Sequence, residues 1–281
     1  MESDSLPEGC IATILSCTTP IDACNLSLVS TTFYSASQSD AVWNSFLPND
    51  YTSIISRSVS DTSFISNSPS KKSIFQALSN RPIIIDNSTK SFQLDKKSGK
   101  KCYMLGARAL NIAWGDTHCY WQWTNIPESR FREVAELNLV CWLEIRGVLN
   151  TNVLSPNTHY VAYFVYKMIN SYGFHEYPVE LSIDTFGGQS SNKNVCLNPN
   201  TEEKPDYYYG EEEILEIRES RQGLQLPNVR RDGWLEIEIG NFFNSSLEDE
   251  EVQMSVMEIK SGQAKKGLII EGIEVRPKDA N

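Results

Sequence analysis

In the stretch Trp234-Leu235-Glu236-Ile237-Glu238-Ile239-Gly240, apolar and charged side chains alternate from Leu235 to Ile239. A period of two is typical of a β-strand with one buried face, here the face that carries the leucine and the isoleucines. Residues 141–146 alternate in the same way, and residues 160–168 and 267–275 are also expected to be strands. Several strands with turn residues between them, and little helical pattern, predict an antiparallel β-sandwich that begins near residue 90.

The first 50 residues have the period of helices instead. Ile11, Ile14 and Leu15 lie at positions i, i+3 and i+4, which places them on one helix face. Ser5 lies two residues before Pro7 and Thr19 lies directly before Pro20, with each proline in a first helical turn, so both are expected to cap helices. A third short helix, capped by Ser39 or Asp40, is expected near residue 43. The further apolar residues at helical spacing are Leu26, Val29, Phe33 and Trp43.

This helical unit is small, and its stability needs an explanation. About 45 residues bury little core, so units of this size usually depend on a metal, a disulfide or a partner. Cys10, Cys17 and Cys24 are spaced by seven, which is not a zinc pattern, and no histidine is near them. We interpret the seven cysteines as buried free thiols and expect neither a metal nor a cofactor. The apolar stripe is therefore expected to bind a partner or to pack on the rest of the chain.

The spaced apolar positions of the unit resemble an F-box over roughly residues 5–48. They run Leu6-Pro7-x-x-x-Ile11-x-x-Ile14-Leu15, then Pro20-x-Asp22, then Leu26-Ser27-Leu28-Val29, then Val42-Trp43. The resemblance implies that the unit docks on a Skp-type adaptor, which joins it to a cullin ligase. The adaptor-binding residues that it implies are Leu6, Pro7, Ile11, Ile14, Leu15, Pro20, Leu26, Val29 and Trp43.

Composition divides the chain into three parts. Residues 1–50 contain six acids and neither Lys nor Arg, whereas half of residues 51–70 are Ser or Thr. These shifts predict a small acidic unit at residues 1–50, a polar linker with a short helical segment at 51–89, and the β-sandwich at 90–281. The resemblance implies that the unit at residues 1–50 is the F-box. The fold class is therefore α + β with two domains, the smaller one helical and the larger one an antiparallel sandwich.

Three of the six tryptophans lie within ten residues, at Trp114, Trp121 and Trp123. Trp114 follows Ile112 in strand alternation, which predicts that it points into the core. Trp121 lies near a turn and is expected to be the more exposed of the two. An indole stacks on the C–H face of a sugar, and carboxylates accept hydrogen bonds from sugar hydroxyls. The cluster is thus suited to a saccharide, although core packing remains the alternative that spacing alone favours.

The same region resembles the phloem protein 2 family, which includes Nictaba-type lectins, over about residues 100–278. The motifs include Leu110-x-Ile112-x-Trp114-x-Asp116, Tyr120-Trp121-x-Trp123, Trp142-Leu143-Glu144-Ile145 and Gly272-Ile273-Glu274-Val275-Arg276-Pro277. The resemblance implies a jelly-roll-like lectin domain that binds N-acetylglucosamine-containing glycans. An F-box joined to this domain resembles a family of plant proteins. The carbohydrate-binding residues that the resemblance implies are Trp114, Trp121, Glu251 and Glu258.

The two acids of that site are seven residues apart. One unbroken strand would place Glu251 and Glu258 on opposite faces. Both reach one site only if a bulge intervenes or if Glu251 belongs to the preceding loop, which the acidic run 248–251 favours. Residues 182–224 are expected to form a long loop with eight acids between 202 and 219, most simply a solvated surface.

The predicted function is that of a substrate-recognition subunit of a Skp-cullin-F-box ubiquitin ligase, itself not an enzyme, whose lectin-like domain binds glycans or glycoproteins. One alternative is an F-box adaptor whose sandwich binds a protein target and no sugar. A less favoured one is a glycoside hydrolase, which needs two carboxylates about 5–10 Å apart. The net charge of −11 argues against nucleic-acid partners and against an anionic membrane surface. Without a signal-peptide pattern or a long apolar run, the expected location is cytoplasm and nucleus.

Overall fold

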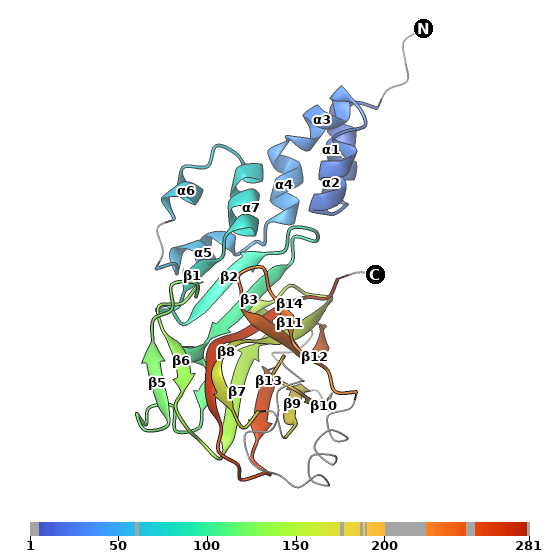
Figure 1. Cartoon of the computed structure of the whole chain (residues 1–281). Coiled ribbons are helices and arrows are strands. Elements are labelled where there is room, and N and C mark those ends of the chain that lie inside the picture. Colours follow the sequence, from blue (N-terminus) through green and yellow to red (C-terminus); the bar gives the residue numbers. More distant parts are fainter. Residues whose placement is uncertain are drawn as a thin grey trace. The chain divides into compact units, whose positions relative to one another are not determined.

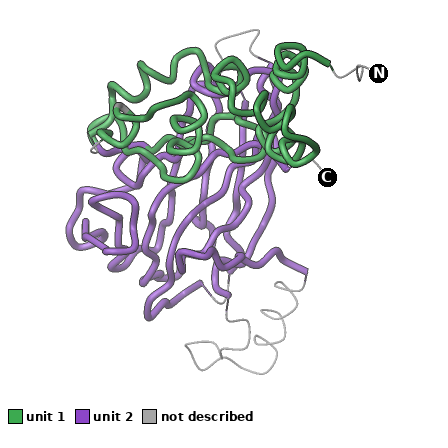
Figure 2. The backbone as a smooth tube through the Cα atoms, turned by 90° about the horizontal axis from the view of Figure 1, so that it is seen from above, with its two compact units in different colours: residues 1–87, 91–103 green, residues 88–90, 104–281 purple. Residues whose placement is uncertain are grey.

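The computed structural model describes residues 6–59, 62–174, 177–185, 188, 190–199, 223–245 and 251–279. Helices come first and an antiparallel β domain follows, which confirms the fold class (Figure 1). The chain forms two compact units (Figure 2). The first contains Met1–Asn87 and Ser91–Tyr103, and the second contains Ser88–Lys90 and Met104–Asn281.

The first unit begins with four short helices: α1 Glu8–Ser16, α2 Pro20–Leu26, α3 Thr31–Ser37 and α4 Asp40–Phe46. Side-chain caps explain where three of them begin. Thr19, Ser30 and Ser39 accept hydrogen bonds from backbone N–H groups at the starts of α2, α3 and α4. Because Ser30 starts a new helix, Val29 lies in the turn between α2 and α3 and not within one continuous helix. Ser5, the expected cap of the first helix, lies outside the described residues.

The segment 51–89, expected to be a polar linker with a short helical segment, adds to the core of the first unit. It forms α5 Tyr51–Ser56, α6 Ser63–Ser66, α7 Lys71–Asn80 and β1 Ile83–Ile85. The Phe75 ring of α7 lies 5.3 Å from the Trp43 ring of α4, centroid to centroid. Ile54 and Leu78 are buried as well. The segment is rich in Ser and Thr, but it also contains a few apolar side chains at helical spacing. Burial of these side chains stabilises its helices.

Two strands follow, β2 Lys90–Leu94 and β3 Lys101–Gly106. Gly99 lies in the turn between them with a φ of +72°, a conformation that glycine adopts without strain. The amide of Asp95 donates to the carbonyl of Lys100 across this turn. The lysine-rich stretch at 96–101 is thus a hairpin turn and the start of a strand.

The second unit contains two antiparallel sheets. One has the strand order β14-β8-β12-β11, with β6 on β14 and β5 on β6, and the other has the order β10-β9-β13-β7-β4. The strands are β4 Asn111–Ile112, β5 Trp121–Thr124, β6 Val134–Leu137, β7 Leu143–Asn150, β8 Thr158–Tyr172, β9 Val179–Thr185, β10 Ser190–Val195, β11 Asn228–Val229, β12 Leu235–Asn244, β13 Glu251–Glu258 and β14 Lys266–Pro277.

The two sheets pack closely face to face. A Cβ atom on Gly240 of β12 would lie 2.5 Å from Cγ2 of Ile183 on β9, so glycine is required where the sheets approach. A Cβ atom on Gly147 of β7 would likewise lie 3.1 Å from Cδ1 of Ile273 on β14. Between these contacts the core consists of the inward residues of both sheets, as in a sandwich.

The region expected to be one long loop, residues 182–224, is partly a hairpin. β9 and β10 pair in antiparallel register from Val179↔Val195 to Asp184↔Ser190. The buried side chains of Leu181 and Ile183 alternate with polar ones, which gives β9 a core face despite its polar neighbours. The eight acids between 202 and 219 lie outside the described residues.

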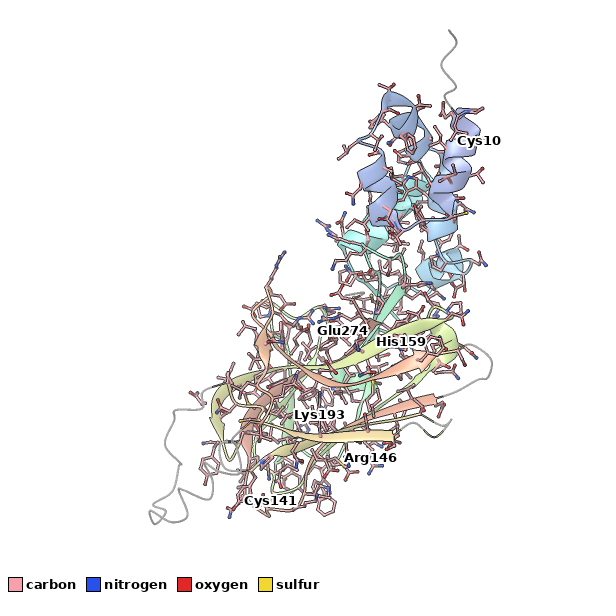
Figure 3. All side chains as sticks on the ribbon, turned by 90° about the vertical axis from the view of Figure 1, so that its right-hand side faces the viewer. Cys10, Cys141, Arg146, His159, Lys193 and Glu274 are labelled. Carbon is pink, nitrogen blue, oxygen red and sulfur yellow. The ribbon has the colours of Figure 1, made fainter. Side chains whose placement is uncertain are left out.

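The prediction that the cysteines are buried is wrong for most of them. Cys10, Cys17 and Cys24 are exposed. The inward positions are taken by Ile11 and Leu15 on α1 and by Pro20 and Ala23 on α2. Figure 3 labels Cys10 on α1. Among the described residues, no helix is long and apolar enough to cross a membrane.

An ion network surrounds Glu274 of β14, which Figure 3 labels. Its carboxylate lies 3.1 Å from Arg130 Nη1, 2.6 Å from Arg230 Nη1 and 3.3 Å from Arg276 Nη1. Burial alone would raise the pKa of Glu274, but the charges of Arg130 and Arg230 outweigh burial and lower this pKa to about 2. The network therefore keeps a buried carboxylate ionised.

Candidate functional sites

The first candidate site is the apolar surface of the first unit. Of the nine residues predicted to bind an adaptor, Leu6, Pro7, Ile14 and Val29 are exposed and Leu26 is half-buried. Leu28, which was not among the predicted residues, is the most exposed large apolar side chain among the described residues of the unit. Its position in the turn after α2 breaks the helical spacing, so periodicity gave no signal for it.

The other four predicted adaptor residues, Ile11, Leu15, Pro20 and Trp43, are buried in the unit itself. The Trp43 indole packs among aromatic rings, and its Nε1 donates to the carbonyl of Ser37 at 2.6 Å. These residues hold the exposed ones in place and do not themselves offer a contact surface. The motif thus combines an exposed apolar face with the core that supports it.

The second candidate site is the loop after β4, which exposes Trp114. The Trp114 side chain is 49% exposed, and its ring centroid lies 5.7 Å from that of Tyr120. The backbone of Trp114 has a φ of +56°, which is rare and strained for a bulky residue. A strained residue that presents a large aromatic ring to water is typical of a binding site.

Two other tryptophans stabilise this loop through hydrogen bonds to its backbone carbonyls. Trp121 begins β5, is 1% exposed, and donates from Nε1 to the carbonyl of Ala113 at 3.1 Å. Trp123 donates from Nε1 to the carbonyl of Gly115 at 2.9 Å. The expectation of a buried Trp114 and an exposed Trp121 is therefore wrong. The positive φ at Trp114 interrupts strand alternation and turns this side chain outward.

Glu258, the last residue of β13, is buried and already bound. It forms an ion pair with the buried ammonium of Lys265 and accepts hydrogen bonds from the backbone N–H groups of Lys260 and Ser261 and from the Ser261 hydroxyl. Burial raises the pKa of Glu258, but the hydrogen bonds from Lys265 and Ser261 outweigh burial, so the net shift is downward. Glu258 orders the turn that joins β13 to β14.

Glu251 lies at the opposite end of β13. The strand pairs with β7 without a register shift from Glu251↔Asn150 to Glu258↔Leu143, so no bulge brings the two acids to one face. Seven residues of extended strand separate them by about 24 Å. Of the four predicted sugar-binding residues, the structure therefore exposes Trp114 and Glu251, buries Trp121 and Glu258, and does not bring the two acids together.

Trp114 and Glu258 do lie at the same end of their sheet. The Ala113 amide donates to the Glu144 carbonyl of β7, and Glu258 pairs with Leu143 on the other side of β7. Two strand spacings of about 4.8 Å separate these backbones. Trp142 stands between them, 44% exposed, with its Nε1 donating to Glu144 Oε2 at 2.8 Å. Trp142 was not a predicted site residue, although its alternation with Glu144 placed it on the polar face.

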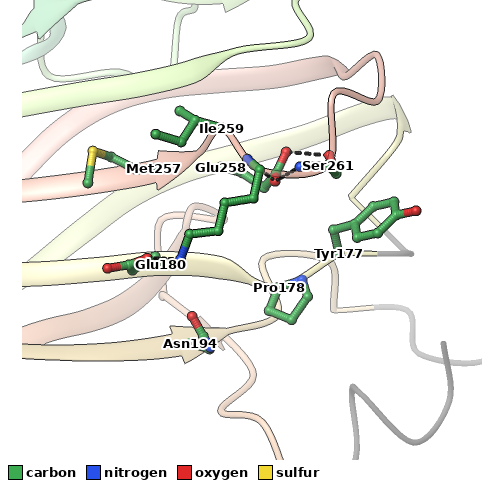
Figure 4. Close-up of a pocket in the computed structure, with 9 residues that line it drawn as sticks. Tyr177, Pro178, Glu180, Asn194, Met257, Glu258, Ile259 and Ser261 are labelled. Atoms are coloured by element: carbon green, nitrogen blue, oxygen red, sulfur yellow. Dashed lines mark hydrogen bonds and ion pairs between the residues drawn. The ribbon is translucent and has the colours of Figure 1, made fainter. Parts of the chain in front are cut away.

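The outer face of this sheet contains a pocket of about 310 Å³ (Figure 4). Its apolar lining is formed by Tyr177, Pro178, Met257 and Ile259, and its polar lining includes Glu180, Asn194 and the turn 258–261. The register explains why three of these residues meet, because Met257 pairs with Glu180 and Glu180 pairs with Asn194. No motif in the sequence marks this pocket.

A helical unit with an exposed apolar face, followed by a β-sandwich that presents an aromatic loop, defines a class of two-domain proteins. The family model of the F-box domain matches residues 3–45, and that of phloem protein 2 matches residues 100–277. The chain belongs to the family of F-box proteins that carry a phloem protein 2 domain.

Curated relatives from Arabidopsis thaliana match the chain over nearly its whole length. F-box protein PP2-B10 is 44% identical, over 98% of this chain and 93% of that protein. F-box protein PP2-B1 is 40% identical, over 99% and 90%, and F-box protein At2g02240 is 45% identical, over 98% and 80%. The similarity therefore covers both units and not the β domain alone.

Proposed function

We propose that this protein is the substrate-recognition subunit of a Skp-cullin-F-box ubiquitin ligase and performs no catalysis itself. The exposed apolar face of the first unit supports this, with Leu6, Ile14, Leu28 and Val29 in water. Covering such side chains with a partner recovers about 25 cal/mol for each Å² of apolar surface removed from water. The F-box match makes a Skp-type adaptor the partner of choice.

Co-purification with the adaptor tests this proposal. Leu6→Ala combined with Pro7→Ala removes two exposed contacts ahead of α1, so adaptor binding should be lost while the unit stays folded. Thr13→Ala, a change on the exposed polar side of α1, is the matched control and should bind as wild type. Undiminished binding of the double variant would show that the adaptor docks elsewhere.

We further propose that the loop around Trp114 binds N-acetylglucosamine-containing glycans. The half-exposed indole with Tyr120 beside it supports this, since a sugar ring stacks on such a surface. Titration with chitotriose should give saturable binding to the full chain, and Trp114→Ala should weaken it. Phe243→Ala, which removes an exposed ring on the other sheet, is the control and should leave binding unchanged.

A second candidate function is recognition of a protein target without sugar. The burial of Trp121 and the commitment of Glu258 to Lys265 favour it, because both leave fewer groups for a glycan. The hydrolase alternative is disfavoured by the separation of about 24 Å between Glu251 and Glu258, since paired catalytic carboxylates lie about 5–10 Å apart. Cytoplasm and nucleus remain the proposed location, which a fluorescent fusion of the full chain would test.

A further inference from the structure

The pocket on the outer face of the β10-β9-β13-β7-β4 sheet already holds a cationic side chain of the protein itself. Lys260 lines this pocket from the turn after β13, and its Nζ donates to Glu180 Oε2 on β9 at 2.9 Å. Figure 4 shows Glu180 on its strand, away from the turn that carries Glu258 and Ser261. The aliphatic stem of Lys260 must therefore extend from the turn toward β9 to make this contact.

The Lys260 ammonium is weakly bound to Glu180. The Lys260 side chain is 82% exposed, and an ion pair this exposed to water contributes little to stability. Holding a long lysine side chain in one conformation also costs entropy. Lys260 can therefore leave Glu180 at little cost.

Glu180 loses its cationic partner when Lys260 leaves. The other acid of the pocket, Glu258, is neutralised by the buried Lys265. Within the described part of the chain, Lys260 is the one cation that pairs with Glu180. An incoming positive charge would thus meet an uncompensated carboxylate beside Met257 and Ile259, whose apolar surface suits an aliphatic stem.

We propose that this pocket receives an arginine side chain of the ligase's protein target, which replaces the ammonium of Lys260 at Glu180. The inference rests on the proposed function as a substrate receptor and names the chemistry of the substrate. Arginine competes better than a second lysine, because its planar guanidinium binds a carboxylate through two parallel hydrogen bonds and stacks on aromatic rings such as that of Tyr177. The net charge of −11 also attracts a basic segment.

The test uses the isotope-labelled full chain and two blocked pentapeptides, one with arginine and one with glutamine between pairs of glycines. Backbone amide shifts should move around the pocket with the arginine peptide and not with the glutamine peptide. Glu180→Gln should weaken the arginine peptide about tenfold, because the charge-assisted hydrogen bonds are lost. Asp184→Asn changes the same face of β9 outside the pocket and should have no effect.

Removing the Lys260 ammonium should instead increase the affinity for the arginine peptide. Lys260→Met keeps an aliphatic stem and removes the ammonium, so the arginine peptide should bind about two- to fivefold more tightly. Lys96→Met, on the exposed turn between β2 and β3, is the matched control and should bind as wild type. A purely structural role of Lys260 would not produce tighter binding.

The outcomes separate this inference from the proposed function. Equal binding of both peptides, no loss in Glu180→Gln, or no gain in Lys260→Met would overturn the arginine pocket. Chitotriose shifting the pocket amides while the arginine peptide does not would overturn it too, in favour of a saccharide. Adaptor co-purification and chitotriose binding through Trp114 are measured on the same variants and should be unchanged, so a failure there reflects the proposed function instead.

Discussion

Truncation of Trp121 should cost more stability than truncation of Trp114. Trp121→Ala removes an indole that is 1% exposed, and truncation of a buried tryptophan typically costs about 3–5 kcal/mol. Loss of the hydrogen bond to the Ala113 carbonyl adds about 1 kcal/mol. Trp114→Ala removes an indole that is half in water, so its cost should be about half as large, on the order of 2 kcal/mol.

Binding should show the reverse order. Trp114 presents its ring to solvent, and loss of a stacked aromatic ring costs about 1–3 kcal/mol, by analogy with stacking on nucleobases. The chitotriose Kd should therefore rise about fivefold to a hundredfold or more in Trp114→Ala. Trp121→Phe keeps most of the buried ring volume, so this second variant should stay folded and bind close to wild type.

Urea unfolding followed by tryptophan fluorescence measures the stability of the second unit, because five of the six tryptophans lie in it. Each alanine variant loses one of these five, so the two can be compared directly. Calorimetric titration with chitotriose measures the Kd of each variant. Equal destabilisation by the two alanine changes would refute the assigned burial. Wild-type affinity in Trp114→Ala would refute the sugar site at this loop.

The remaining predictions concern buried groups. Lys265→Met should destabilise the second unit by about 3–5 kcal/mol, because it leaves the Glu258 carboxylate buried and without its ion-pair partner. The double variant that also carries Glu258→Gln should regain much of this stability. Urea unfolding compares the two variants, and equal losses would contradict the buried ion pair. The pKa of Glu274 is about 2 in the folded chain, below its unfolded value near 4, so its stabilisation is present above pH 4 and lost as the pH falls toward 2. Glu274→Gln should flatten that acid dependence, and an unchanged pH profile would argue against the network. Phe75→Ala should lower the stability of the first unit by about 3–5 kcal/mol, measured by urea unfolding followed by helical circular dichroism. A change of under about 1 kcal/mol would show that residues 51–89 are a linker and not part of the core.

The sequence carried most of the fold because its signals are local. Alternation over 234–240 lies within β12, and the hydroxyl caps Thr19 and Ser39 mark the starts of α2 and α4. A strand period and a cap depend on residues a few positions apart, so composition and spacing are enough to find them. The helical and β-sheet parts could be predicted for this reason.

The candidate sites could be predicted only in part, because their geometry depends on turns and distant pairings. The positive φ of Trp114 reverses the direction of its side chain, and no period records such a turn. The partner of Glu258 is Lys265, beyond the end of the strand. The pocket around Glu180 requires the register of three strands, which the order of residues does not state.

The first unit is discontinuous in sequence, and this affects how the protein is made. The unit is completed by Ser91–Tyr103, so an emerging chain of 50 residues contains the F-box pattern but not the whole of its core. Domains tend to fold as units while the ribosome adds about 5–20 residues each second. The first unit is therefore complete only after synthesis has passed residue 103. A gene fusion that ends near residue 50 would transfer the F-box pattern without the residues that complete its core.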